Sequence, residues 1–338
     1  MSRPIVLGLS GGVDSAAAAL RLKAEGWDVT GVWLDLGFGD PEPAREAAKQ
    51  LGVAFSVFDA AEAHERLVRV PFGEAYQKGL TPNPCAVCNP SVKLPSLLAA
   101  AEHIGAEYIA TGHYAAIETK NGRACLRQSG GDKDQSYMLS LVGEDILARL
   151  VLPLSGLTKP EIRALAASAG LKNASAPDSQ DICFIPDGDY GAWLEAQGFG
   201  LPAGDFTDRD GKVLGRHLGL HRYTVGQRRG LGVSSDSRLY VCALDGVRNR
   251  VVLGKEADLL TSEIHVTDLH FGLLDSLDTP IRAEVKLRSR PQKFSALLLP
   301  DGDGMTLRFD TPVRRPAGGQ IAAAYDEEGF VLVAGTIN

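Results

Sequence analysis

Short apolar runs alternate with amphipathic segments through the first half of the chain. Runs of strand length lie at 4–9, 28–34, 54–59 and 108–111, and helical patterns lie at 15–25, 42–51, 61–78, 93–104 and 159–169. This alternation predicts a doubly wound parallel β-sheet with helices on both faces, which is an α/β fold. In such sheets ligands bind beyond the carboxyl ends of the strands.

The pattern changes near residue 202, after which glycine, proline, aspartate and β-branched residues dominate. Strand-length runs recur at 212–214, 239–243, 251–253, 281–286, 295–299, 305–309, 321–325 and 330–336. They predict two small antiparallel β modules, the last of them a β-barrel. The expected domains are therefore 1–201, 202–258 and 259–338.

The first expected turn carries a chemical signal. Residues 8–15 read Gly-Leu-Ser-Gly-Gly-Val-Asp-Ser, between the first strand and the first helix. Gly11 and Gly12 allow backbone N–H groups to approach a phosphate, and the positive end of the helix points to the same place. Two serines of the segment add hydroxyl donors, and Asp14 beside a phosphate implies a Mg²⁺ ion between them. The segment resembles the pyrophosphate loop (PP-loop) of enzymes that split ATP between its α- and β-phosphates.

The composition of the 338 residues fits an ordinary globular enzyme, because 44% are hydrophobic and 23% are charged. No stretch has the length and apolarity of a membrane span. Met1-Ser2-Arg3 leads directly into the first strand, which leaves no room for a signal peptide, so a cytoplasmic protein is expected. The net charge of −7 excludes a protein that is basic all over, but a local basic face is enough to bind nucleic acid.

Basic residues gather in both expected β modules. In the first they are Arg209, Lys212, Arg216, His217, His221, Arg222, Arg228, Arg229 and Arg238, and in the second Lys286, Arg288, Arg290, Lys293, Arg308, Arg314 and Arg315. A surface of this kind grips a folded RNA by its shape and its phosphates. The alternative is solvated charge that merely balances the acidic residues.

The five cysteines are not expected to form a disulfide framework in a reducing compartment. Cys85-Ala-Val-Cys88 follows the proline-rich Thr81–Pro84, and this spacing indicates redox, metal or sulfur-transfer chemistry. Zinc is disfavoured, because no second Cys-x-x-Cys or close histidine pair completes four ligands. The third informative cysteine is Cys183, in an Ile-Cys-Phe segment. The other two, Cys125 and Cys242, lie in apolar runs and are assigned to the core.

Taken together, the PP-loop, the proline-flanked cysteine and the Ile-Cys-Phe segment resemble the tRNA-uridine 2-sulfurtransferases, or tRNA 2-thiouridylases. Further segments match that family in order along the whole chain: Ala-Thr-Gly-His-Tyr-Ala at 110–115, Lys-Asp-Gln-Ser-Tyr at 133–137, Gly-Gln-Arg-Arg-Gly-Leu-Gly at 226–232, and the C-terminal segments 286–290 and 316–320.

The resemblance implies a reaction and a set of site residues. In that reaction ATP with Mg²⁺ adenylates the C2 oxygen of the wobble uridine of a tRNA, and a cysteine persulfide then delivers sulfur to C2. Cys183 would carry the persulfide, Cys88 would resolve it as a disulfide, and a sulfur donor protein or sulfide would supply the sulfur. The implied ATP site is Gly8, Leu9, Ser10, Gly11, Gly12, Val13, Asp14 and Ser15, with Leu34 and Gly112 along the adenine and ribose. Asn83, Pro84 and Cys85 would face the target base, while His113, Lys133, Asp134, Gln135, Arg288, Ser289 and Gln320 would contact tRNA.

Three features depart from the family pattern. Cys85 occupies a position that is usually aspartate, Gln180-Asp181 replaces the more usual Thr-Gly, and the loop after Leu34 is short. With Cys85 present, the three thiols Cys85, Cys88 and Cys183 match related PP-loop enzymes that hold a 4Fe–4S cluster with one open iron for hydrosulfide. Both sulfur routes stay open at this stage. Another PP-loop adenylating enzyme, such as an amidotransferase-type synthetase, and a non-catalytic RNA-binding or sulfur-carrier protein are the alternative functions.

Overall fold

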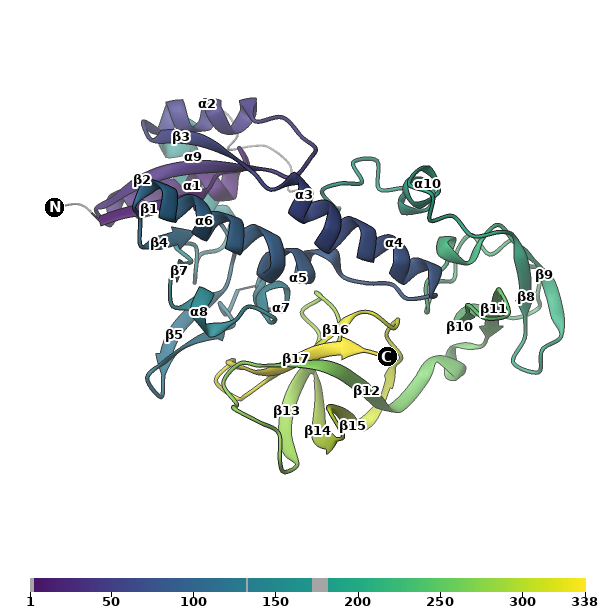
Figure 1. The fold of residues 1–338 in the computed structure, drawn as a ribbon. Coiled ribbons are helices and arrows are strands. Elements are labelled where there is room, and N and C mark those ends of the chain that lie inside the picture. Colours follow the sequence, from purple (N-terminus) through teal and green to yellow (C-terminus); the bar gives the residue numbers. More distant parts are fainter. Residues whose placement is uncertain (1–2, 132, 172–181) are drawn as a thin grey trace.

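Five parallel strands form the sheet of the first domain in the computed structural model, which describes residues 3–131, 133–171 and 182–338 (Figure 1). In the order β3-β2-β1-β4-β7 they are Ala54–Asp59, Trp27–Asp35, Arg3–Gly8, Tyr108–Ala110 and Leu150–Val151. The chain moves outward from β1 to β3 and then returns to the other side of β1 with β4. The switch point of the sheet therefore lies between β1 and β4, as the predicted doubly wound topology requires.

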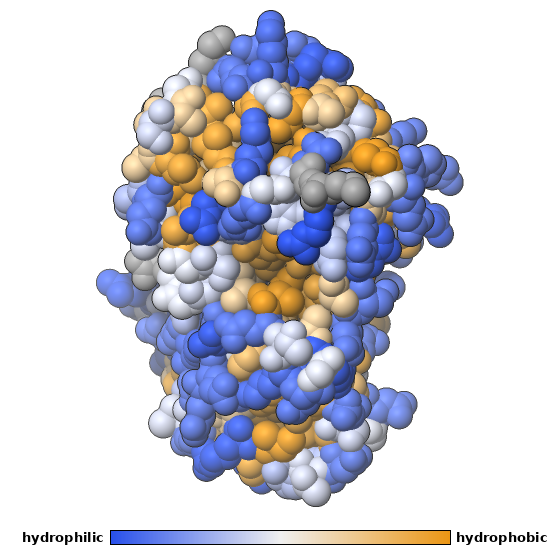
Figure 2. All heavy atoms as spheres, turned by 90° about the vertical axis from the view of Figure 1, so that its left-hand side faces the viewer, coloured by the Kyte–Doolittle hydropathy of each residue, from blue (hydrophilic) through white to orange (hydrophobic). Residues whose placement is uncertain are grey.

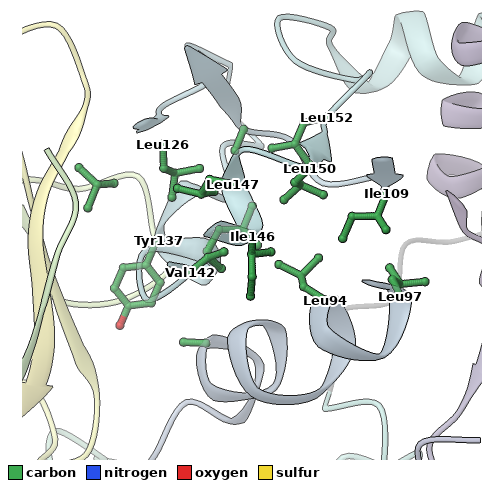
Figure 3. Close-up of a cluster of buried hydrophobic side chains, with 14 of the residues drawn as sticks. Leu94, Leu97, Ile109, Leu126, Tyr137, Val142, Ile146, Leu147, Leu150 and Leu152 are labelled. Atoms are coloured by element: carbon green, nitrogen blue, oxygen red, sulfur yellow. The ribbon is translucent and has the colours of Figure 1, made fainter. Parts of the chain in front are cut away.

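Helices cover both faces of this sheet. On one face lie α1 (Val13–Ala24), α2 (Glu42–Leu51) and α9 (Lys159–Ser168), and on the other lie α6 (Leu94–Ile104), α7 (Ser136–Leu139) and α8 (Glu144–Leu147). The four alanines 16–19 are fully buried, and their small side chains let α1 pack closely on the strands. Figure 3 shows the second face, where Leu94 and Leu97 of α6 lie beside Ile109 of β4, and Leu147 of α8 belongs to the same apolar cluster.

The helix expected at 61–78 is interrupted by a π-helical turn. It comprises α3 (Ala61–His64), η1 (Glu65–Arg69) and α4 (Val70–Gln77). A second π-helical turn, η2 (Asn89–Lys93), joins α5 (Pro84–Cys88) to α6. Prolines at 71 and 95 lack the N–H that an α-helix would use there, which favours the local change of hydrogen-bond register. Turns of this kind are frequent at functional sites, and α5 packs against η1.

The central β module is a mixed four-stranded sheet in the order β10-β11-β8-β9. Its strands are Tyr240–Asp245, Arg250–Gly254, Gly204–Thr207 and Val213–His217. Neighbours pair antiparallel except β11 and β8, which are parallel. Helix α10 (Tyr190–Ala196) leads into the module, and Glu195 fixes the junction by accepting hydrogen bonds from His221 at 3.0 Å and from Arg222.

The last module is a closed six-stranded antiparallel barrel, as predicted. Its order is β12-β15-β14-β13-β16-β17, with bounds Leu260–Phe271, Gly304–Arg314, Phe294–Asp301, Ile281–Lys286, Ile321–Tyr325 and Val331–Ile337. Closure leaves no open sheet edge. The barrel lies below α5 and α7 in Figure 1, and the hairpin of β5 (Ala116–Lys120) and β6 (Arg123–Arg127) also contacts it through a bridge between Arg127 and Phe330.

The surface seen from the side where the N-terminus lies has apolar patches surrounded by polar side chains (Figure 2). This side is opposite the carboxyl ends of the parallel strands, because β1 begins beside the N-terminus (Figure 1). Across the described part of the chain, no helix combines the length and the apolar character that crossing a bilayer requires.

Candidate active site

The turn after β1 forms a polar corner at the carboxyl edge of the sheet, which we call the glycine corner (residues 8–15). Ser15 Oγ donates to the Gly12 carbonyl at 3.0 Å, and the Ser10 N–H donates to Ser15 Oγ at 3.2 Å. Gly11 has φ +82°, and a Cβ there would lie 2.8 Å from the backbone N of Ala44, so glycine is required. Gly12 is the N-cap of α1 without a side-chain cap, which leaves N–H donors for an anion.

Two residues expected along the nucleotide flank this corner. Gly112 follows β4, and a Cβ there would lie 3.0 Å from both the Asp14 carbonyl carbon and the Ser15 N. Leu34 lies near the end of β2, half-buried on the other side of β1. The sheet order β2-β1-β4 therefore brings the segments around Leu34, Ser10 and Gly112 to one edge, where a doubly wound sheet binds its ligand.

Charged and hydroxyl side chains meet at the start of α1. Lys159, the first residue of α9, places Nζ 2.7 Å from Oδ1 and 2.9 Å from Oδ2 of Asp14. The Tyr114 hydroxyl donates to the same carboxylate. Asp14 is thus held toward the corner, where it fits the role of a ligand for the Mg²⁺ of a bound nucleotide.

The cysteine helix α5 brings two thiols to one side. Asn83 caps this helix by accepting from the Ala86 N–H at 3.2 Å, and Pro84 begins it. Cys85 is half-buried and Cys88 is buried, three residues apart and therefore on the same helical face. Cys88 belongs to an apolar cluster with Phe184, the residue after Cys183.

Electrostatic coupling places Cys183 in the neighbourhood of both helix thiols. Desolvation of its sulfur raises the pKa of Cys183 to about 11, and interactions with Cys85 and Cys88 add to this rise. Desolvation also raises the pKa of Cys88. The ammonium of Lys93 opposes both shifts. We call Cys85, Cys88, Cys183 and Lys93 the thiol centre; the raised pKa values keep Cys88 and Cys183 mostly protonated at neutral pH.

Two neutral histidines border the thiol centre. His64 is fully buried, neither of its ring nitrogens has a partner among the described residues, and burial with nearby Arg69 and Lys93 lowers its pKa to about 4. Burial and Lys93 lower the pKa of His113 to about 3. His113 is fixed by a 2.8 Å hydrogen bond to Thr111 Oγ1. Gly112 lies against the backbone of the glycine corner, and the charge of Lys93 helps to lower the pKa of His113. Residues 111–113 therefore connect the two centres.

The thiols as placed do not fit an iron–sulfur cluster. Over residues 3–131, 133–171 and 182–338 there is no group of three or more histidine, cysteine, aspartate or glutamate side chains arranged as metal ligands. Gln180 and Asp181, which precede Cys183, lie outside the described residues.

The barrel holds the segment that precedes the cysteine helix. Gln320 Nε2 donates to the Thr81 carbonyl at 2.5 Å, and the Thr81 N–H donates to the Gly318 carbonyl at 2.8 Å. Tyr137 reaches from α7 to the barrel, and its hydroxyl donates to the Ile321 carbonyl at 2.8 Å (Figure 3). Arg288 is half-buried close enough to Tyr137 to interact with it electrostatically. Gln320 therefore lies against the segment that leads to Asn83, and Tyr137 connects Arg288 with Asn83.

Asp134, one of the three residues 133–135 expected to contact tRNA, forms an ion pair with the barrel. The Asp134 carboxylate pairs with Lys286 of the barrel at 2.8 Å, and both side chains are less than a tenth exposed. Gln135 accepts from the Tyr114 N–H at 2.9 Å through its side chain, while Lys133 and Ser289 are exposed. Contact of Asp134 with tRNA would need this ion pair to open. Its geometry indicates instead a residue that anchors the barrel.

The structure divides the basic residues of the β modules into two kinds. His217 and His221 are buried, and many of the others are paired with acids, namely Arg209, Arg216, Arg222, Lys286, Arg308 and Arg314. Arg228, Arg229 and Arg238 are exposed, and none has an ion pair within the described chain. Arg228 and Arg238 line a hollow of about 440 Å³ with Gly230 and Gly232. Of the basic residues expected to bind RNA, these three therefore have a side chain that is both exposed and without an ion pair in the described chain.

Three models of known protein families match the chain in succession. They are described as a tRNA methyl transferase HUP domain at residues 3–187, a tRNA methyl transferase PRC-barrel domain at 197–255 and an aminomethyltransferase beta-barrel domain at 261–337. Full-length relatives are named tRNA-specific 2-thiouridylase MnmA. The protein of Acidithiobacillus ferrooxidans is 43% identical, with 96% of this chain and 95% of that protein covered. That of Clostridium acetobutylicum is 37% identical, with 100% and 99% covered, and that of Koribacter versatilis is 39% identical, with 99% and 98% covered.

The chain belongs to the tRNA-specific 2-thiouridylase family. Its sequence resemblance to this family is thereby confirmed over the whole length. The structure adds two residues that the sequence did not single out. Lys159 contacts Asp14 at the glycine corner, and Lys93 lies near the thiols of the thiol centre. The position of Lys159 could have drawn attention in the sequence, because a cation at the first position of a helix is unfavourable with the helix dipole. Nothing in the sequence distinguishes Lys93.

Proposed function

We propose that this protein transfers sulfur to C2 of the wobble uridine of tRNA in an ATP-dependent reaction. The names of its full-length relatives support the overall reaction, and the arrangement of the two centres supports its steps. One observation carries the proposal: Cys183, remote in sequence from Cys88, couples electrostatically to it, and residues 111–113 link this place to the glycine corner.

The glycine corner would bind the phosphates of ATP. The N-terminus of α1, the serine hydroxyls and Gly11 form the cradle, and Asp14 would hold the Mg²⁺ ion, which offsets phosphate charge. The uracil O2 attacks the α-phosphorus and pyrophosphate leaves, so that the poor leaving group of C2 becomes AMP. The target base must leave its stack to reach this place, which requires base flipping.

Sulfur then comes from the thiol centre. A donor protein that carries sulfane sulfur as a persulfide transfers it to the Cys183 thiolate and is released as a thiol; the terminal sulfur of the resulting Cys183 persulfide attacks C2 while AMP leaves. The Cys88 thiolate attacks Sγ of Cys183, releasing 2-thiouridine and leaving a Cys88–Cys183 disulfide, which a cellular dithiol reduces. Lys93 is the cation that lowers the pKa of both thiols and so raises their thiolate fraction.

Cys85 stands where the family pattern usually has aspartate, and this third thiol raises a second route of sulfur delivery that an experiment can test. In that route the three thiolates hold a 4Fe–4S cluster. Anaerobic purification followed by iron and acid-labile sulfide analysis distinguishes the two: an iron-free preparation with full activity excludes the cluster, and activity that follows iron content excludes the persulfide relay.

Incubation of the purified protein with ATP, unmodified tRNA and a sulfur donor tests the function. We expect AMP, pyrophosphate and 2-thiouridine in equal amounts, measured by chromatography and by mass spectrometry of the tRNA digest. AMP release without tRNA would instead indicate a synthetase that adenylates a small molecule. ATP binding without turnover under every condition would indicate a non-catalytic RNA-binding or sulfur-carrier protein.

A further inference from the structure

Cys85 carries a thiol that the proposed persulfide route does not use. The persulfide of Cys183 and the resolving thiol of Cys88 complete the sulfur transfer, yet Cys85 lies on the same helix α5 as Cys88. The two helix thiols differ in access, because Cys85 is half-buried whereas Cys88 is only 6% exposed. A disulfide between Cys88 and Cys183 would therefore have one sulfur enclosed by protein, with a further thiol of the chain beside it.

The spacing of the two helix cysteines suits a disulfide within α5. Residues three apart on a helix have Cβ atoms about 5–6 Å apart, and a disulfide needs about 3.5–4.5 Å. The first turn of α5 is held loosely: the Ala86 N–H donates to the side chain of Asn83 at 3.2 Å, and the Val87 N–H reaches the Asn83 carbonyl at 3.4 Å. Cys85 can therefore approach Cys88 by a small shift of this turn.

The surroundings of Cys183 bring it to the same place. Its pKa responds to both helix thiols, so the three sulfurs share one region. Phe184, the next residue, packs in the apolar cluster that contains Cys88. The two remaining cysteines lie on β6 and β10, in other sheets. Apart from Cys183 itself, Cys85 is therefore the cysteine of the described residues that can reach the sulfur of Cys88.

We propose that Cys85 is a second resolving thiol, which moves the disulfide from Cys88–Cys183 into the Cys85–Cys88 pair. This relay rests on the proposed function, because that function creates the first disulfide. The Cys85 thiolate, having given up its proton, attacks the sulfur of Cys88; the Cys85–Cys88 bond forms, the Cys88–Cys183 bond breaks, and the departing Cys183 thiolate takes up a proton. The number of disulfides stays the same, so the exchange consumes no oxidant or reductant, and a cellular dithiol later reduces the Cys85–Cys88 bond.

Proximity favours this internal thiol over thiols in solution. A group held three residues away acts at an effective concentration far above that of a dissolved thiol. The ammonium of Lys93, which lowers the pKa of Cys183, stabilises the thiolate that departs. Cys183 lies at the surface, so its freed thiol can accept the next sulfur before a reductant arrives. The relay thus separates the loading of sulfur from the reduction of the enzyme.

A single turnover without reductant tests the relay in the full-length protein. The wild type, loaded with one persulfide sulfur, reacts with ATP, Mg²⁺ and unmodified tRNA; acid quenching, alkylation with N-ethylmaleimide and mass spectrometry then locate the disulfide. We expect the Cys88–Cys183 link to appear first and to give way to Cys85–Cys88, with Cys183 alkylated. In a control with the Mn²⁺ complex of the ATP analogue that has an α,β-methylene bridge, adenylation is blocked and no disulfide should form.

Replacement of Cys85 should stop the exchange at its first disulfide. In Cys85→Ser, we expect Cys88–Cys183 to persist, and the oxidised protein should accept radiolabelled sulfur from the donor at Cys183 on the order of tenfold less than the oxidised wild type. Cys242→Ser, which removes another half-buried thiol, should behave as the wild type does. A residue with a merely structural role would not change which sulfurs are linked.

The outcomes separate the relay from the proposed function. If 2-thiouridine forms and the wild type keeps a Cys88–Cys183 disulfide with Cys85 alkylated, the relay is wrong while sulfur transfer stands. A disulfide in the analogue control would also contradict the relay, because oxidation would then be independent of thiolation. If no 2-thiouridine forms, or if activity follows iron content, the persulfide route fails and the relay with it. Should Cys85→Ser not fold, the position of the disulfide in the wild type still decides.

Discussion

The glycine corner and the thiol centre differ in how much of the chain each one needs. The corner is made by one short turn, one residue after β4 and the first residue of α9, all belonging to the first sheet and its helices. The thiol centre draws on α5, two π-helical turns and the segment around Cys183, and the barrel holds its lead-in at Thr81.

The two centres also differ in polarity. At the corner, hydroxyls, backbone groups and an ion pair satisfy one another before any ligand arrives. At the thiol centre, aromatic and aliphatic side chains bury Cys88, whereas Cys183 lies at the surface, and desolvation raises the pKa of both thiols. The comparison teaches that the proposed nucleotide site is formed by neighbouring segments of one sheet, whereas the proposed sulfur site depends on the assembly of several distant segments.

Removal of the proposed persulfide sulfur should give the largest effect. In Cys183→Ser, we expect 2-thiouridine formation to fall by more than about a thousandfold, because the nucleophile is lost. Binding of the Mn²⁺-loaded ATP analogue should stay unchanged, since the corner does not use this residue. Cys242→Ser, in the central module, is the matched control and should keep full activity. Loss of nucleotide binding in Cys183→Ser would contradict the independence of the two centres.

Loosening the barrel should harm the thiol centre more than the corner. In Asp134→Asn, the buried Lys286 ammonium loses its counter-charge, so we expect the free energy of unfolding to fall by about 3–5 kcal/mol. Urea denaturation followed by tryptophan fluorescence measures this. The double variant Asp134→Leu/Lys286→Met removes both charges and should recover much of the loss.

Transfer of labelled sulfur to tRNA measures the functional effect of the same variant. At urea concentrations below its unfolding transition, Asp134→Asn should still bind the ATP analogue but should no longer thiolate tRNA. If analogue binding and thiolation decline together, the corner depends on the barrel as much as the thiol centre does.

The pH dependence of alkylation probes the apolar character of the thiol centre. The thiolate is the reactive form, so a pKa raised to about 11 means that reactivity keeps rising with pH beyond the range of an ordinary thiol. Between about pH 7 and about pH 9 the rate of Cys183 modification by iodoacetamide should increase about a hundredfold. Mass spectrometry of the labelled peptide gives the rate, and a rate that is already half-maximal at about pH 8.5 would show a solvated thiol instead.

The same contrast explains what the sequence predicted. The glycine corner is contiguous, and its glycines, serines and aspartate each have a local physical reason, so residues 8–15 were recognisable without coordinates. The parallel sheet and the barrel followed from apolar periodicity, and both are confirmed.

Contacts between residues far apart in the chain could not be predicted from apolar periodicity or local motifs. Nothing in the sequence reports that Asp134 meets Lys286 or that Lys159 meets Asp14, because each pair joins segments about 150 residues apart in chain order. The π-helical turns were also missed, since periodicity over 61–78 fits one continuous helix. Whether the thiols hold an iron–sulfur cluster or carry sulfur as a persulfide depends on their relative positions in space, which the Cys-x-x-Cys spacing alone does not determine.

Crowding the corner should produce a moderate effect confined to the nucleotide. In Gly112→Ala, the new Cβ would lie 3.0 Å from the backbone at Asp14 and Ser15, so the first turn of α1 must shift. We expect analogue affinity to fall roughly tenfold, because misplaced N–H donors bind phosphate less well. Gly131→Ala, which meets no atom within 4 Å, is the control. Equal affinities in both variants would show that Gly112 does not shape the corner, and the labelling rate of Cys183 should change in neither.

The smallest effects should come from residues that belong to neither centre. Arg228 and Arg229 are exposed without an ion pair in the described chain, whereas Arg216 pairs with Asp205 at 2.9 Å. If the unpaired arginines contact phosphates, Arg228→Gln and Arg229→Gln should each lower the slope of log affinity for tRNA against log salt by about one. Arg216→Gln should change it less, because that cation already has a partner. Filter binding over a range of salt concentrations decides this, and equal slopes in all three variants would place the RNA on another face.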